Sequence, residues 1–171
     1  MNEPHTHPAA LDTDDLMRDC TMQASRSSGP GGQHRNKVQT AVRLVHKPTD
    51  VSGSATERRS REQNRRMALF RLRVNLALQV RSPLDPTRQA SETWQSRCRR
   101  GCVSINPTHQ DFPTVLAEAL DVVAACDVDI KAAAEALNCS ATQLVRLLKA
   151  EPRALKWLNE QRESRGLHRL R

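Results

Sequence analysis

A short loop rich in glycine is the part of the sequence best suited to chemistry. It runs from Ser27 to Lys37 and holds three of the six glycines of the 171-residue chain. Gly31 and Gly32 can adopt a positive φ without a Cβ clash, and Pro30 restricts φ just before them. A backbone of this kind presents main-chain N–H groups rather than side chains to a ligand. The loop is therefore predicted to approach a ligand closely, with Gln33 at its tip.

The positive charge of the chain is concentrated around this loop. The formal net charge is +8, and residues 21–101 carry 17 basic and five acidic side chains, whereas residues 102–171 carry nine of each. Fifteen of those 17 basic residues are arginine, which favours planar, bidentate contact with phosphate. A field of this kind steers a protein towards a polyanion, and a merely solvated basic face is the alternative.

Strands and one long helix are expected to position the loop. The patterns predict a strand that ends near residue 25, a second over residues 40–46 and a third over residues 51–56, all in one antiparallel sheet. A helix is predicted from residue 57 to about residue 80, with an apolar stripe that covers the sheet. The stripe consists of Met67, Phe70, Val74 and Ala77.

Arginine crowds the first half of that helix. The residues concerned are Arg58, Arg59, Arg61, Arg65 and Arg66. Like charges at this spacing destabilise an isolated helix, so contact with a polyanion is the compensation that the pattern favours.

The rest of the chain differs in composition. Residues 1–11 are predicted to be a disordered lead-in, residues 82–112 a linker or an unassigned lobe, and residues 113–171 an all-α region. The patterns in that region predict helices over residues 115–125, 130–137 and 142–149. The last two resemble a helix-turn-helix, in which Asn138 takes the positive φ of the turn and Ser140 caps the second helix. The predicted fold class is therefore α+β: a small antiparallel sheet with a packed long helix, followed by an all-α region.

The five cysteines have no disulfide-framework spacing, and the chain has no apolar run near 18 residues. We therefore expect reduced thiols, a cytoplasmic location and no membrane contact. Cys98 and Cys102 with His109 nearby could seed a zinc site, but a fourth ligand is not obvious, and no metal or other cofactor is expected.

The loop and its flanks resemble the GGQ domain of class I peptide chain release factors and their stand-alone ribosome-rescue relatives. The resemblance covers roughly residues 12–80 and rests on Ser-Ser-Gly-Pro-Gly-Gly-Gln-His at 27–34, Asn-Lys at 36–37, Thr-Ala-Val-Arg at 40–43, Glu-Arg-Arg-Ser at 57–60 and Asn-Arg-Arg at 64–66. It implies hydrolysis of the ester that joins a nascent peptide to tRNA, in the peptidyl transferase centre of the ribosome.

The resemblance also implies roles for individual residues. Gly31, Gly32 and Gln33 are expected to be catalytic, with the backbone N–H of Gln33 as the donor to the developing oxyanion. The residues expected to contact RNA are Arg26, Ser28, His34, Arg35, Asn36, Lys37, Arg58, Arg59, Arg65 and Arg66. The expected partners are ribosomal RNA and peptidyl-tRNA, bound by a monomer.

Three functions remain open on the sequence alone. Because about 25 residues precede the loop, too few for a stop-codon-reading domain, codon-independent release or rescue of stalled ribosomes is favoured. A specialised release factor for unusual or damaged ribosomes is the first alternative. A non-catalytic RNA- or DNA-binding module is the second, although the neutral charge of residues 102–171 argues against DNA reading by the helix-turn-helix.

Overall fold

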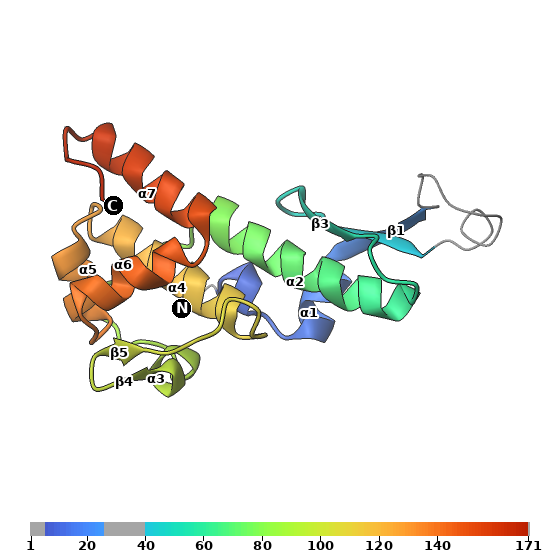
Figure 1. Ribbon diagram of the computed structural model, residues 1–171, viewed down its shortest axis with the longest axis horizontal. Coiled ribbons are helices and arrows are strands. Elements are labelled where there is room, and N and C mark those ends of the chain that lie inside the picture. The colour runs from blue at the N-terminus through green and yellow to red at the C-terminus, as the bar shows by residue number, and fades with distance from the viewer. Residues whose placement is uncertain (1–5, 26–39, 171) are drawn as a thin grey trace, which may run out of the picture.

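The computed structural model has a small sheet at one end and a group of helices at the other, joined by one long helix (Figure 1). It describes residues 6–25 and 40–170. The elements of the N-terminal half are η1 (Pro8–Ala10), α1 (Thr13–Arg18), β1 (Cys20–Ser25), β2 (Ala41–His46), β3 (Val51–Ala55) and α2 (Arg61–Gln79). Those that follow are α3 (Glu92–Arg97), β4 (Cys98–Arg99), β5 (Cys102–Val103), α4 (Phe112–Ala125), α5 (Ile130–Ala136), α6 (Ala141–Lys149) and α7 (Pro152–Glu163). The predicted α+β class is confirmed.

The three longer strands form one antiparallel sheet in the order β1, β2, β3, as predicted. Ser25 at the end of β1 pairs with Ala41 at the start of β2. Along β2, Leu44 is fully buried on the face covered by α2, whereas Arg43 is exposed on the opposite face. The sheet therefore has one packed face and one open face.

Gly53 allows β3 to approach α2 closely. A Cβ atom at Gly53 would lie 2.3 Å from the backbone nitrogen of Leu72 and 2.4 Å from the carbonyl oxygen of Ala68. Both distances are below any real Cβ contact, so only glycine fits between the strand and the helix backbone.

The buried face of α2 differs from the apolar stripe predicted from spacing. Val74 and Ala77 are buried as expected, but Met67 is 36% exposed and Phe70 is half-buried. The fully buried row runs through Asn64, Ala68, Leu72 and Leu76. A polar residue and an alanine give weak hydrophobic signals, so the spacing of large apolar residues selected a neighbouring row. Helix α2 also begins later than predicted, at Arg61, because the side chain of Ser60 caps it.

The N-terminal segment is folded where the structure describes it, unlike the predicted disordered lead-in. Ala9 in η1 is fully buried. The Nδ1 atom of His7 accepts a hydrogen bond from the backbone N–H of Ala9 at 3.0 Å, so Nε2 carries the proton and donates to the carbonyl oxygen of Val80 at 3.2 Å. Thr114 in α4 also bonds the carbonyl oxygen of Ala9. These contacts explain why a short polar segment is ordered.

Residues 82–112, to which the sequence assigns no structure, contain α3 and the β4–β5 hairpin. Trp94 in α3 is 1% exposed, and its Nε1 donates to the carbonyl oxygen of Leu137 at 2.9 Å. Glu118 in α4 accepts hydrogen bonds from the backbone and the hydroxyl of Ser91, which caps α3. The segment is therefore packed against the helical region rather than extended as a linker.

The helical region follows the predicted order, with α7 added. Asn138 has φ of 51°, and the hydroxyl of Ser140 caps α6, both as predicted for the turn between α5 and α6. Whether these two helices act as a helix-turn-helix stays a prediction. Helix α7 begins at Pro152, and its buried apolar residues are Ala154 and Leu158. Helix α7 lies in the region predicted to be all-α, although no separate helix was predicted there.

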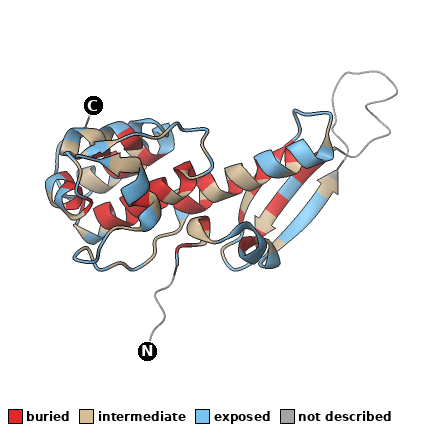
Figure 2. Cartoon of the chain, turned by 90° about the horizontal axis from the view of Figure 1, so that it is seen from below, coloured by how far each residue is buried: buried red, intermediate tan, exposed pale blue. Residues whose placement is uncertain are grey.

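Helix α2 connects the sheet to the helical region through a continuous core (Figure 2). At its C-terminal end, the Arg81 guanidinium donates to Oδ1 of Asp121 at 2.9 Å and lies 5.2 Å from the centre of the Trp157 ring. These contacts join the end of α2 to α4 and α7. The predicted division into residues 12–81, 82–112 and 113–171 stays a prediction. Among the residues described, no helix is long and apolar enough to cross a membrane.

Candidate functional site

The predicted catalytic residues Gly31, Gly32 and Gln33 lie outside the described residues. So do six of the residues predicted to contact RNA, namely Arg26, Ser28, His34, Arg35, Asn36 and Lys37. The structure does describe the two strands that hold the ends of this segment. Ser25 and Ala41 are partners in the antiparallel ladder, so the strands bring the two ends of residues 26–39 together.

We call the paired ends of β1 and β2, together with Thr40 and Arg58, the loop base. Asn64 connects its parts. Its side chain is fully buried, and its Nδ2 atom donates to the carbonyl oxygens of Thr40 at 2.7 Å and Arg58 at 2.9 Å. Its Oδ1 atom accepts from the backbone N–H of Arg58 at 2.9 Å. One amide thus ties the residue that precedes β2 to the segment that precedes α2. A buried amide with these bonds satisfied is a strong positional constraint.

A second clamp holds the connection between β3 and α2. Arg71 forms an ion pair with Glu57 at 2.7 Å and donates to the carbonyl oxygen of Ser54 at 2.7 Å. The other carboxylate oxygen of Glu57 accepts from the backbone N–H of Thr56 at 2.9 Å. The hydrogen bond from Arg71, followed by the backbone bonds, lowers the pKa of Glu57 to about 2. Glu57 therefore stays ionised at neutral pH and holds the segment that carries Arg58.

The predicted arginines gather at the N-terminal end of α2, beside this clamp. Arg58 and Arg59 are exposed, and within residues 6–25 and 40–170 neither has a carboxylate partner. Arg65 and Arg66 are also on the surface but share Glu62, at 3.7 Å and 3.1 Å. The N-terminal end of a helix dipole is itself positive, so arginines placed there are electrostatically unfavourable without an anion. This position strengthens the prediction of a polyanionic partner.

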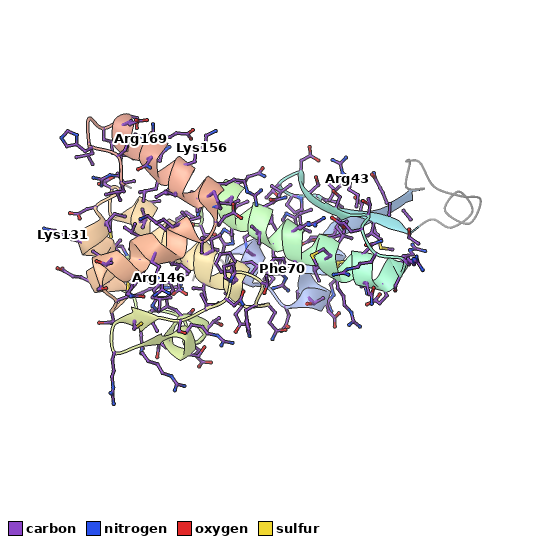
Figure 3. The ribbon with its side chains drawn as sticks, viewed as in Figure 1. Arg43, Phe70, Lys131, Arg146, Lys156 and Arg169 are labelled. Carbon is purple, nitrogen blue, oxygen red and sulfur yellow. The ribbon has the colours of Figure 1, made fainter. Side chains whose placement is uncertain are left out.

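The open face of the sheet adds a basic side chain that the sequence patterns did not single out. Arg43 projects from β2 (Figure 3) and donates to the hydroxyl of Ser52 at 3.3 Å. The alternation of buried and exposed residues in this strand was the signal that could have found it.

The proposed zinc ligands do not form a metal centre. Across the described ranges, no group of three or more His, Cys, Asp or Glu side chains is arranged to hold a metal ion. The Nδ1 atom of His109 accepts a hydrogen bond from the backbone N–H of Asp111 at 3.1 Å, so Nε2 carries the proton, and the guanidinium of Arg97 lies 3.2 Å from it. Burial raises the pKa of the Cys98 thiol and raises that of Cys139 to about 12, so these thiols stay protonated.

Comparison with protein families matches the RF-1 domain over residues 12–106, which is more than half of the chain. The chain belongs to the RF-1 domain family. Its RF-1 domain includes the sheet, α2, α3 and the β4–β5 hairpin, whereas α4–α7 lie beyond the matched residues.

The chain is also similar to curated peptide chain release factors. The chain is 39% identical over 95 residues to peptide chain release factor 1 of Caulobacter vibrioides, and the aligned residues make up 56% of this chain and 26% of the relative. It is 42% identical over 66 residues to peptide chain release factor 2 of Lactiplantibacillus plantarum, covering 39% and 18%. It is 47% identical over 58 residues to a chloroplastic peptide chain release factor of Arabidopsis thaliana, covering 34% and 13%. The chain thus spans about a quarter or less of the length of these relatives.

Proposed function

We propose that this protein hydrolyses the ester of peptidyl-tRNA inside the ribosome, as a codon-independent release or rescue factor. The observation that carries the proposal is the intact Ser27–Lys37 sequence, with Gly31, Gly32 and Gln33, in a chain that belongs to the RF-1 domain family. The paired ends of β1 and β2 and the Asn64 amide support it, because they provide a rigid base for the segment that carries these residues.

The chemistry requires little from the protein beyond a positioned donor. Ester hydrolysis builds negative charge on the carbonyl oxygen, and an N–H group already directed at that oxygen stabilises it without reorganisation. We assign this donor to the backbone N–H of Gln33, while the side chain restricts the nucleophile to water. General acid–base groups would then come from ribosomal RNA and the tRNA.

The charge of the chain supports RNA as the partner. Arg58 and Arg59 lie exposed on the surface at the N-terminal end of α2, next to Thr40 at the loop base. In this proposal they contact the phosphate backbone, together with Arg65 and Arg66, and Gln33 enters the peptidyl transferase centre. The protein acts as a monomer without a cofactor.

The codon-independent part of the proposal is supported by α4–α7. These helices lie outside the residues that match the RF-1 domain, and α4 packs directly on α2. They give the RF-1 domain a neighbouring element through which it could be recruited without reading a codon. The same observation favours the second candidate, a release factor specialised for unusual or damaged ribosomes, which differs only in the ribosomal state bound.

Peptide release from ribosomes tests the proposal. Ribosomes that hold labelled peptidyl-tRNA are given no codon, a sense codon or a stop codon in the vacant site, and release is measured as a function of protein concentration. Equal release in the three cases supports codon independence, whereas release only with a stop codon contradicts it. Undamaged and nuclease-cleaved ribosomes compared in the same assay separate the two candidates.

Two variants of Gln33 test the mechanism. Gln33→Ala keeps the backbone N–H and should retain a substantial fraction of the rate. Gln33→Pro removes the N–H, so release should fall by about a hundred- to a thousandfold. Gly32→Ala is a companion that tests tolerance of φ while it leaves that N–H in place. Equal rates for the alanine and proline variants would mean that the side chain carries the chemistry. No release by the wild type would leave the non-catalytic binding module as the function.

A further inference from the structure

Within the neutral segment 102–171, helix α6 carries Arg146 and Lys149 and no acidic side chain. Most of the carboxylates elsewhere in the segment have partners within the protein. Those engaged in ion pairs or hydrogen bonds are Asp111, Glu118, Asp121, Asp129, Glu151, Glu160 and Glu163. The other two, Asp127 and Glu135, lie before α5 and on α5. Five of the nine, Asp127, Asp129, Glu135, Glu160 and Glu163, lie exposed, but none of them is on α6.

Four basic side chains remain exposed or partly exposed on the hairpin and on α6. They are Arg99, Arg100, Arg146 and Lys149, called here the hairpin–α6 surface. Within the part of the chain that the structure describes, none of the four has a carboxylate partner. Arg146 and Lys149 are three residues apart and so share one face of α6, opposite the buried Leu144 and Leu148.

The β4–β5 hairpin is docked on the turn that begins α6. The backbone N–H of Ser140, the N-cap of α6, donates to the carbonyl oxygen of Gly101 at 3.1 Å. The thiol of Cys98 donates to the carbonyl oxygen of Asn138 at 3.6 Å. Arg100 is the residue next to Gly101, so its backbone is fixed one residue from the contact with α6. The hairpin is thus in direct contact with the start of α6.

Arg100 has a positive φ, as do Val128 and three other described residues that are not glycine. The two residues that connect β4 and β5 are Arg100, with φ of 52°, and Gly101, with φ of 75°. A two-residue turn with positive φ at both positions prefers Asn or Gly at the first. An arginine in this region is uncommon, and the left-handed conformation is unfavourable for its Cβ atom.

We propose that the hairpin–α6 surface binds the phosphate backbone of helical RNA. The proposal rests on the proposed function, in which the partner is ribosomal RNA, and it assigns to α4–α7 a recruiting contact separate from the loop. Arginine suits phosphate because its planar guanidinium donates two parallel hydrogen bonds. The deep, narrow major groove of helical RNA excludes side chains. A basic surface therefore contacts the phosphate backbone of the RNA rather than its bases.

A matched pair of charge reversals tests the surface. Arg100→Glu with Arg146→Glu changes the net charge by the same amount as Lys131→Glu with Lys156→Glu. Figure 3 labels Lys131 on α5 and Lys156 on α7, away from Arg146. The full chain is titrated with a labelled RNA duplex, and with DNA of the same sequence, over a range of salt concentrations. The hairpin–α6 variant should bind RNA on the order of tenfold more weakly, with a salt slope lower by about one for each phosphate that is no longer neutralised. Equal weakening by the control pair would overturn the proposal, as would tighter binding of the DNA.

Arg100→Asn separates binding from folding. Asparagine tolerates the positive φ, so the variant should melt about 2–4 °C higher than the wild type while it binds the RNA duplex more weakly. A variant that is more stable and binds RNA unchanged would show that Arg100 has no role in binding, which overturns the proposal.

Peptide release by the same variants keeps this inference distinct from the proposed function. Release at saturating protein should be retained, because the surface lies on the helical region and not at the loop base, and half-saturation should move to a higher protein concentration. A wild type that binds the duplex through this surface but releases no peptide would contradict the proposed function and leave the RNA site standing. Release that reaches half-saturation at an unchanged concentration in the hairpin–α6 variant would contradict the recruiting role.

Discussion

The side chain of Asn64 donates a hydrogen bond to the carbonyl oxygen of Thr40 at 2.7 Å, across 24 positions of sequence. Thr40 is the first described residue after the segment that carries Gln33, so α2 holds the backbone that follows the loop. The replacement Asn64→Asp keeps an acceptor for the N–H of Arg58 but sets an oxygen against two carbonyl oxygens. We expect it to lower the free energy of unfolding by about 3 kcal/mol, measured in urea.

Gln63→Glu is the control for this replacement, because it makes the same amide-to-acid change at an exposed neighbour. If both variants were equally stable, the buried amide would not be a constraint on the loop base. Peptide release by Asn64→Asp, measured where the protein is still folded, should also fall.

Gly53→Ala is predicted to destabilise the contact between β3 and α2. The added methyl group would meet the backbone of Leu72 at 2.3 Å, and backbone atoms cannot move aside as the end of a side chain can. We expect a decrease of about 2–3 kcal/mol in the free energy of unfolding. Ser54→Ala, at an exposed position of the same strand, should change stability little. A thermal melt of Gly53→Ala that matches the wild type would mean that α2 shifts without cost.

The stability of the N-terminal segment should depend on pH through His7. Burial lowers the pKa of His7 from 6.5 to about 4. The unfolded chain therefore binds more protons than the folded one between these values. Stability from His7 is complete above pH 6.5 and is lost as pH falls to 4, by about 2–3 kcal/mol. Protonation of Nδ1 would also remove the acceptor for the N–H of Ala9.

The replacement His7→Gln tests this pH dependence, because the variant cannot titrate. Asp121 works in the opposite direction: burial raises its pKa to about 6, so its contribution falls as pH rises from about 4 to 6. Asp121 contributes equally to the wild type and the variant, so the difference between their free energies of unfolding at each pH reports His7 alone. A difference that stayed constant from pH 7 to pH 4 would contradict the assigned role of His7.

Arg58 and Arg59 should contribute to ribosome binding and not to the chemical step. Their joint replacement by alanine should weaken binding and flatten its salt dependence, while release at saturation stays nearly unchanged. Arg65→Ala with Arg66→Ala should weaken binding less, because Glu62 already neutralises part of their charge. Loss of saturated release with intact binding would show that the assignment to binding is wrong.

The sequence predicted the fold where local patterns carry the information. The strands of the sheet and most of α2, α4, α5 and α6 were found to within a few residues, because alternation, helical periodicity and caps such as Ser140 are local. Residues 82–112 were not, since Trp94 is ordered by a bond to Leu137, 43 positions away. Elements shaped by distant partners leave little periodicity to detect.

The roles of Gly31, Gly32 and Gln33 stay predictions, because these residues lie outside the described ones, and the residues that support their segment were not predicted. The glycine-rich sequence carries its own signal, and the arginines were visible as a cluster. Asn64 and Glu57 act through Thr40, Ser54 and Arg71, and such partners are known only from the fold. The contact between the β4–β5 hairpin and the start of α6 was likewise not predicted, because residues about 40 positions apart make it.

Helix α2 sets a fixed distance between the two regions to which we assign RNA contacts. It is continuous over 19 residues without glycine or proline, which is a length of about 28 Å. Asn64 joins one end to the loop base, and Arg81 joins the other to Asp121. No flexible joint lies along α2. A partner can therefore bind both ends of the helix at once only if its own two binding surfaces are separated by the same distance. If the partner is the ribosome, as we propose, the protein would discriminate between ribosomal conformations by length. With one end bound, the effective concentration of the other end would be high only for the conformation that fits.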